Sequence, residues 1–186
     1  MKSRLLSLFV LLALLAASCR TGGPGRPAKT VAAFFNKYQN RPGFRTTDWS
    51  AGLTTRLLLG RLGKLGGDND ISQALTAVRG VKVLTFTPTS VKSEKLVAEG
   101  LLKEVDGLLS NERYTPLPVT STDDSAGKLR YSARQQGDRV QELVATGNVQ
   151  GAPDSFMLVD VSGDFTKEQL NQLTKFLPTA VNQITK

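Results

Sequence analysis

The stretch Phe156–Ser162, with the sequence FMLVDVS, is the most apolar of the strands that the sequence predicts. A short apolar run rich in Val and Leu that follows a polar Gly/Pro loop is typical of a β-strand. Strands that are covered by protein on all sides read as nearly continuous apolar runs. We therefore expect this segment to lie in the centre of a β-sheet, with the rest of the fold built around it.

Further strands are predicted on the N-terminal side of this segment. Val81–Thr87 (VKVLTFT) alternates apolar and polar side chains, which is typical of a strand with one buried face. Pro116 and Pro118 restrict the segment Tyr114–Thr122 to a sheet edge or a bulge, because proline lacks the amide proton of a ladder hydrogen bond. The other predicted strands are Phe44–Ser50, Leu129–Arg134 and Arg139–Thr146.

Helices are predicted between the first strands and at both ends of the domain. Their ranges are 31–38, 53–65, 71–79, 93–110 and a last helix that begins after Thr166. Thr166 and Gln169 have the spacing of a capping box, as do Asp70 and Gln73, and Gly80 is expected to end the helix over 71–79. From the first strand onward the order is β-α-β-α-β-β-β-β-α. This order predicts an α+β fold: a two-layer sandwich with the helices on one face of a mixed or mostly antiparallel sheet.

The composition limits the chemistry that is open to this chain. It has 186 residues, 40% of them hydrophobic, which suffices for one domain with a sizeable core. It has no histidine, so catalysis by a Ser-His-Asp or Cys-His arrangement and metal sites built on histidine are excluded. With one cysteine, an intramolecular disulfide is excluded as well. No cofactor and no metal site is predicted.

The N-terminus has the features of an export signal. Lys2 and Arg4 precede Leu5–Ala17, a run whose only polar residue is Ser7. This run is shorter than the roughly 20 apolar residues of a membrane-spanning helix, and it fits the hydrophobic region of a secretory signal. It ends in Leu-Ala-Ala-Ser-Cys at residues 15–19, which resembles the lipobox of a bacterial lipoprotein.

The lipobox predicts cleavage between Ser18 and Cys19 and lipidation of the Cys19 sulfur. Several acyl chains on one residue anchor a protein firmly, since each buried methylene contributes about 0.8 kcal/mol. The chain is then divided into a lipoprotein signal peptide (1–18), the lipidated cysteine with a Gly/Pro-rich tether (19–30) and a single α+β domain (31–186). The alternative is a plain secretory signal, cut after Ala17 or Ser18, that leaves a free thiol.

Positive charge is concentrated in the first part of the mature chain. Between Arg20 and Gly66 there are nine basic residues and a single acidic one, Asp48. One interpretation is that Arg20, Arg26 and Lys29 contact a membrane surface, because a basic side chain near anionic lipid headgroups contributes about 1 kcal/mol. The simpler interpretation, which we favour, is a solvated charged face. Nucleic acid is not expected as a partner of an exported protein.

Several segments together resemble a family of bacterial envelope lipoproteins that is catalogued as domain of unknown function four-two-five-two. They are the lipoprotein-like signal, GLTTRLLLGRL (52–62), ALTAVRGVKVLTF (74–86), LVAEGLLKEVDGLL (96–109), VQELVATG (140–147) and SFMLVDVSGDFT (155–166). The resemblance implies an exported α+β domain of the bacterial envelope with no assigned activity and no known site residues. It also implies a link to envelope sensing, because genes of the family lie near sigma-factor regulators.

The candidate catalytic residues are carboxylates. Asp160 and Asp164, together with Glu142, could form a pair for acid–base chemistry of the kind that hydrolases use. We expect instead that Asp160 faces solvent on the polar side of the sheet, and we predict no catalytic residue. Asp68 and Asp70 resemble the start of a calcium loop, but the loop position that requires Glu holds Arg79.

These observations predict a lipid-anchored, non-catalytic binding or structural module in the periplasm of a Gram-negative bacterium. The anchor is the lipid on Cys19, and the expected partner is another envelope protein. Arg20 favours the outer membrane, because Asp at that position is the signal for retention in the inner membrane. Two alternatives remain open: a carrier of a small apolar ligand or lipid, and a hydrolase that uses a carboxylate pair.

Overall fold

A computed structural model describes residues 26–50, 69–88, 91–118 and 129–184. One sheet has the strand order β1-β2-β6-β5-β4-β3, and every pair of neighbours is antiparallel. The strands are β1 (Phe44–Ser50), β2 (Val78–Phe86), β3 (Thr115–Leu117), β4 (Arg130–Gln136), β5 (Arg139–Val149) and β6 (Ala152–Phe165). The helices are α2 (Val31–Tyr38), α4 (Asn69–Thr76), α5 (Val91–Asn111) and α6 (Lys167–Ile184).

The fold class and the order of elements agree with the sequence. From β1 onward the order is β-α-β-α-β-β-β-β-α, and the sheet is antiparallel, so the α+β prediction is confirmed. β6 lies between β2 and β5, as expected for the most apolar strand. The helix predicted over 53–65 lies outside the described residues. Among the described helices, none is long and apolar enough to cross a membrane.

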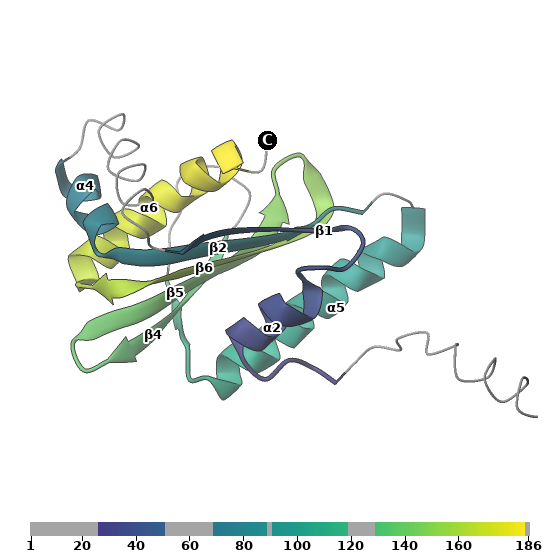
Figure 1. Cartoon of the computed structure of the whole chain (residues 1–186), viewed down its shortest axis with the longest axis horizontal. Helices are drawn as coiled ribbons and strands as arrows, with labels where there is room; N and C mark the ends of the chain where they lie inside the picture. The colour runs from purple at the N-terminus through teal and green to yellow at the C-terminus, as the bar shows by residue number, and fades with distance from the viewer. Residues whose placement is uncertain (1–25, 51–68, 89–90, 119–128, 185–186) are drawn as a thin grey trace, which may run out of the picture.

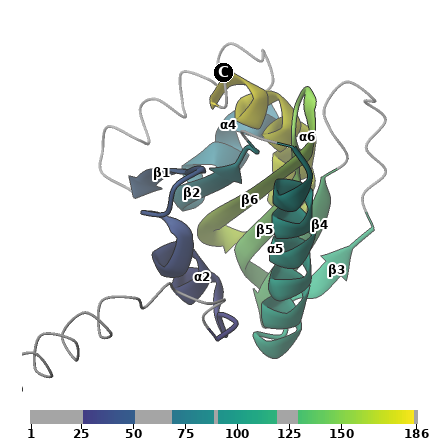
Figure 2. The same cartoon turned by 90° about the vertical axis from the view of Figure 1, so that its right-hand side faces the viewer.

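The arrangement of layers differs from the prediction, because helices cover both faces of the sheet (Figure 1). Phe156 and Leu158 of β6 pack with α2 and α5 on one face, whereas Met157 and Val159 pack with α4 and α6 on the other. In the view turned by 90°, α5 runs in front of the sheet with α2 to one side (Figure 2). The continuous apolar run of β6 has this double burial as its physical cause.

Aromatic side chains fix α2 to the sheet. Phe34, which is fully buried, lies 4.7 Å from Tyr38 and 5.9 Å from Phe156, measured between ring centroids. Tyr38 continues the series to Phe44 and Phe86, with 4.9 Å between the centroids of each successive pair. Offset and tilted ring pairs of this kind stabilise a core beyond the area that they bury. α2 is therefore positioned by β1, β2 and β6 together.

Some predicted element ends are confirmed and others are wrong. At the start of α6, the Gln169 amide donates to Thr166 Oγ1 (3.2 Å) and the Thr166 amide donates to Gln169 Oε1 (2.9 Å), which confirms that capping box. Asp70 lies inside α4 rather than before it, and Gly80 lies inside β2 rather than after a helix. α4 ends at Thr76 because Val78 and Val81 are already needed as buried strand residues on the α4/α6 face.

Candidate functional site

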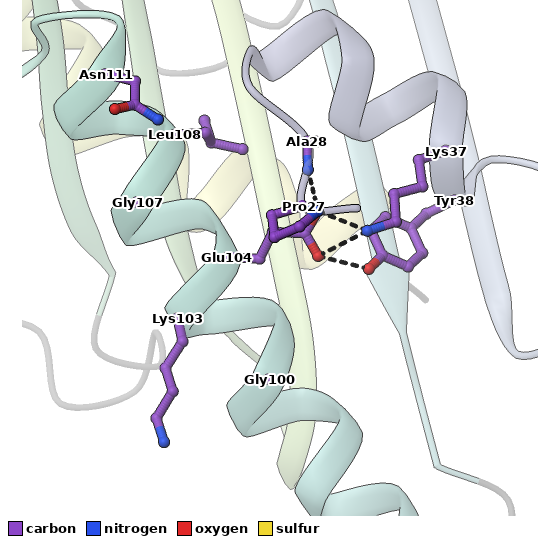
Figure 3. Close-up of a pocket in the computed structure, with 10 residues that line it drawn as sticks. All are labelled: Pro27, Ala28, Lys37, Tyr38, Gly100, Lys103, Glu104, Gly107, Leu108 and Asn111. Carbon is purple, nitrogen blue, oxygen red and sulfur yellow. Dashed lines mark hydrogen bonds and ion pairs between the residues drawn. The ribbon is translucent and has the colours of Figure 1, made fainter. Parts of the chain in front are cut away.

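A pocket of about 510 Å³ lies between α5 and the segment that leads into α2 (Figure 3). Gly100 and Gly107 leave the α5 side of the pocket open, since no atom lies within 4 Å of the position that a Cβ would take at either residue. The described residues that line it are Pro27, Ala28, Lys37, Tyr38, Gly100, Lys103, Glu104, Gly107, Leu108 and Asn111. We take this pocket as the candidate site.

The α5 wall of the pocket follows from helix geometry. Gly100, Glu104, Gly107 and Asn111 are three or four residues apart, and such positions share one face of a helix. The buried residues Leu101, Val105 and Leu108 turn toward the sheet. α5 therefore combines an apolar face that holds it on the sheet with a face of small and polar residues that is open to a ligand.

Glu104 is the centre of the hydrogen-bond network in the pocket. Its carboxylate accepts from the Ala28 amide (2.6 Å), from Lys37 Nζ (2.8 Å) and from Tyr38 Oη (2.7 Å). Burial raises the pKa of Glu104, but the hydrogen bonds from Ala28, Lys37 and Tyr38 outweigh it, so the net pKa lies below the ordinary value. Burial and the bond to Glu104 raise the pKa of Tyr38, which stays a neutral donor.

A second carboxylate, directly after the C-terminal end of α5, holds the same chain segment. Glu112 accepts a hydrogen bond of 2.6 Å from the Val31 amide at the first residue of α2. A carboxylate at that position also interacts favourably with the positive end of the helix dipole. We call Ala28, Val31, Glu104 and Glu112 the N-terminal clasp. Through it, α5 fixes the direction in which the chain enters the domain.

The predicted site residues at the N-terminus are described only in part. Arg26 and Lys29 lie beside the clasp and are exposed. The Arg26 carbonyl accepts a bond of 3.2 Å from Lys37 Nζ, which joins it to the edge of the pocket. Ser18, Cys19 and Arg20 lie outside the described residues.

The candidate carboxylates form one pair rather than a triad. Asp160 of β6 is opposite Lys82 and Val144, and Glu142 is two residues before Val144 on β5, so both carboxylates lie on the α2/α5 face. The expectation that Asp160 faces solvent is wrong. Burial and the neighbouring Glu142 raise the pKa of Asp160 to about 8.

Asp164 is separate from this pair, at the outer end of β6. It accepts a hydrogen bond of 3.0 Å from Arg139 Nε, and its backbone carbonyl accepts one of 2.7 Å from Arg139 Nη2. The bond from Arg139 holds the pKa of Asp164 below its ordinary value. Asp164 is therefore a half-exposed ion-pair partner.

The acidic residues of the clasp were missed by the sequence analysis. Glu104 lies on α5 and Glu112 directly follows it, and their partners are between 66 and 81 residues away. A contact at that distance leaves no periodic signal in one sequence. The one usable signal was that α2 has no acidic residue in its first turn, so the positive end of its dipole is left for a carboxylate from elsewhere in the chain.

The clasp predicts a stability loss for Glu104→Gln. The carboxylate of Glu104 accepts hydrogen bonds from three donor groups. In the variant, the Gln amide nitrogen is itself a donor and would lie next to some of these donors. We therefore expect the free energy of unfolding to fall by about 1–2 kcal/mol. Chemical denaturation measures this change. Glu99→Gln, on the exposed side of the same helix, is the matched control and should change stability by less than about 0.5 kcal/mol. Equal stability of the two variants would contradict the role given to Glu104.

The comparisons with known proteins give a family and no closer match. The model of the family described as Domain of unknown function (DUF4252) matches residues 48–173, which is more than half of the chain. No curated protein and no solved structure matches. The matched range includes strands β2 to β6, helix α5 and the Glu142–Asp160 pair.

Proposed function

The chain belongs to the DUF4252 family, and on this premise we propose that it is a lipid-anchored envelope protein whose folded part binds another envelope protein without catalysing a reaction. The observation that carries the proposal is the sequence Leu-Ala-Ala-Ser-Cys at residues 15–19, which follows an apolar run and precedes a Gly/Pro-rich tether. In this proposal the outer membrane of a Gram-negative bacterium holds Cys19, and the domain faces the periplasm.

The clasp supports this proposal because it brings the end of the tether to the pocket. Cys19 and Arg26 are seven residues apart, which is about 25 Å at full extension. The pocket then stays within a short distance of the lipid surface. Arg26 and Lys29, which are exposed on the same segment, would be attracted to anionic headgroups there.

The character of the pocket favours a peptide-like partner. Pro27 and Ala28 offer apolar surface, and Leu108 lines the pocket from a nearly fully buried position, while Lys103 and Asn111 supply a charge and an amide. Sites that bind protein segments combine an apolar centre with polar groups at the rim. A carrier of a small apolar ligand would need a deep apolar cavity between the helices and the sheet. This pocket lies instead between α5 and the segment that leads into α2.

The Glu142–Asp160 pair is the observation that favours the second candidate function, hydrolysis. A carboxyl group with a pKa near 8 beside a second carboxyl group resembles the division between a general acid and a general base. A substrate would have to reach the pair past Tyr114, which is buried against Glu142. We therefore give priority to the binding function.

The anchor is tested by Cys19→Ser. We expect the wild-type protein to be in the membrane fraction, with a mature mass that includes acyl chains, and the variant to lose both properties. Arg20→Asp is the matched variant, because it keeps the lipid and should move the protein from the outer to the inner membrane in a density gradient. A Cys19→Ser protein that stays in the membrane fraction with an unchanged mass would refute the anchor.

A further inference from the structure

Five polar side chains gather on the α2/α5 face of the sheet, away from the pocket. We call Lys82, Tyr114, Arg134, Glu142 and Asp160 the carboxyl cluster. Glu142 lies opposite Arg134 on β4, which donates a hydrogen bond to its carboxylate. Lys82 lies opposite Asp160 on β2. The Tyr114 ring lies under the Arg134 guanidinium, with 5.7 Å between the guanidinium carbon and the ring centroid.

Two atoms of this cluster are buried without a hydrogen-bond partner. They are Asp160 Oδ1 and Tyr114 Oη, and Tyr114 as a whole is only 7% exposed. Both Asp160 and Tyr114 interact with the same neighbour, Glu142. Buried polar atoms in native proteins almost always have partners. Tyr114 Oη can donate directly to the Glu142 carboxylate. Asp160 Oδ1 instead faces another acceptor in Glu142, so the two carboxyl groups can form a hydrogen bond only if one of them carries a proton.

We propose that Glu142 and Asp160 hold one proton between them, and that this proton keeps the corner between α5 and β3 closed. A proton on one carboxyl turns an acceptor into a donor, so the orphaned Asp160 oxygen gains a partner in Glu142. Two adjacent carboxylates that were both ionised would repel each other in a buried place, and sharing one proton removes that repulsion.

The surrounding charges leave this proton in place. Lys82 Nζ is 3.5 Å from the Asp48 carboxylate on β1, and its side chain is 43% exposed, so it is shared with solvent and with another acid. Arg134 donates a hydrogen bond to Glu142 and also interacts electrostatically with Glu112, directly after α5. Burial and the charge of Glu142 raise the pKa of Tyr114, which therefore stays neutral. Each basic group of the cluster is therefore also paired with another carboxylate, so neither Lys82 nor Arg134 neutralises Asp160 by itself.

The chain connects this cluster directly to the N-terminal clasp. Glu112, Arg113 and Tyr114 are consecutive: Glu112 holds the Val31 amide, and Tyr114 packs against Glu142. Between them Arg113 has a φ of 60°, and the Tyr114 amide donates to the Leu109 carbonyl (2.9 Å). A non-glycine residue in this conformation is held by its surroundings. Loss of the proton should therefore loosen the corner and weaken the hold of Glu112 on α2.

Carbon-13 NMR of the side-chain carboxyl groups in the full mature domain tests the proposal directly. We expect one carboxyl of the pair to titrate above pH 7, and Asp160→Asn to abolish that titration while the rest of the spectrum stays native. We also expect the amide protection of the residues with an N–H in 112–117, that is all but Pro116, to fall at least about tenfold when the wild-type proton is lost. In Asp160→Asn this protection should not change over the same pH range. Asp164→Asn, in the half-exposed ion pair of the same strand, is the matched control and should leave the high titration intact.

Two results would overturn the proposal. If the Asp160 carboxyl of the wild type titrates below pH 5.5, it holds no proton at neutral pH that could be shared with Glu142. If the protection of residues 112–117 responds to pH equally in wild type and in Asp160→Asn, the proton does not control the corner. The wild-type titration needs no variant, so it decides the first point even if a substitution impairs folding.

Discussion

Gly163→Ala is expected to lower the free energy of unfolding by about 3 kcal/mol or more, the range of severe overpacking in a core. A Cβ at Gly163 would lie 2.1 Å from Phe165 Cζ and 2.5 Å from the Ala77 carbonyl oxygen. Phe165 is fully buried on the α4/α6 face and cannot move aside freely, and Ala77 presents backbone. The carbonyl of Ala77 also accepts a hydrogen bond from the Asp164 amide, so a shift there would break the bond between β6 and the residue that precedes β2.

Gly107→Ala is the matched control for this prediction. Gly107 lies inside α5, and a Cβ there would meet no atom within 4 Å. Because Ala is the better helix former, we expect this variant to gain about 0.5–1 kcal/mol. Denaturation with urea, followed by circular dichroism, compares the two. A loss of less than about 1 kcal/mol in Gly163→Ala would mean that the core around Phe165 can rearrange, contrary to the packing described here.

Gly163 also shows where prediction from the sequence reaches its limit. The apolar run of β6 predicted a central strand correctly, but the predicted strand ended at Ser162, whereas β6 continues to Phe165. Glycine weakens a strand in isolation and usually marks an end or a bulge. Here it marks the close approach of Phe165 and the backbone at Ala77, and the register between β2 and β6 shifts at the same place. That contact joins segments about 85 residues apart, so no local pattern records it.

The candidate site was predictable to a smaller extent than the fold. Local patterns indicated the order of elements and the capping box at Thr166, because each depends on neighbours in the chain. The clasp depends on Glu104 and Glu112 meeting backbone amides of a distant segment. Asp160 was assigned to the solvent side because a charge in an apolar strand usually faces water. Its burial beside Glu142 becomes visible only once the register of β5 and β6 is known.

Asp160 is expected to make the domain less stable as the pH rises from about 4 to about 8. Its pKa is about 8 in the folded state and near the ordinary 3.8 in the unfolded chain, so between these values the folded state binds more protons. The free energy of unfolding then falls with increasing pH, by at most about 1.4 kcal/mol per pH unit. Glu104 acts in the opposite direction, because its lowered pKa gives stability that is lost as the pH falls below its ordinary value of 4.5. Maximum stability is therefore expected on the acidic side of neutral.

Asp160→Asn should remove the fall in the free energy of unfolding that the wild type shows as the pH rises toward 8. The Asn amide can donate to Glu142 at every pH, so the variant should match the wild type near pH 5 and exceed it by about 2–4 kcal/mol at pH 9, where the wild-type pair carries two charges. Urea denaturation at five pH values between 5 and 9 measures both curves. Asp164→Asn serves as the control, because Asp164 is half-exposed and its pKa is lowered, so it contributes no slope in this range. Parallel curves for wild type and Asp160→Asn would show that Asp160 is already ionised in the folded protein at neutral pH. The steep fall in the wild type alone would instead identify this one buried carboxyl as the group that sets the alkaline limit of the fold.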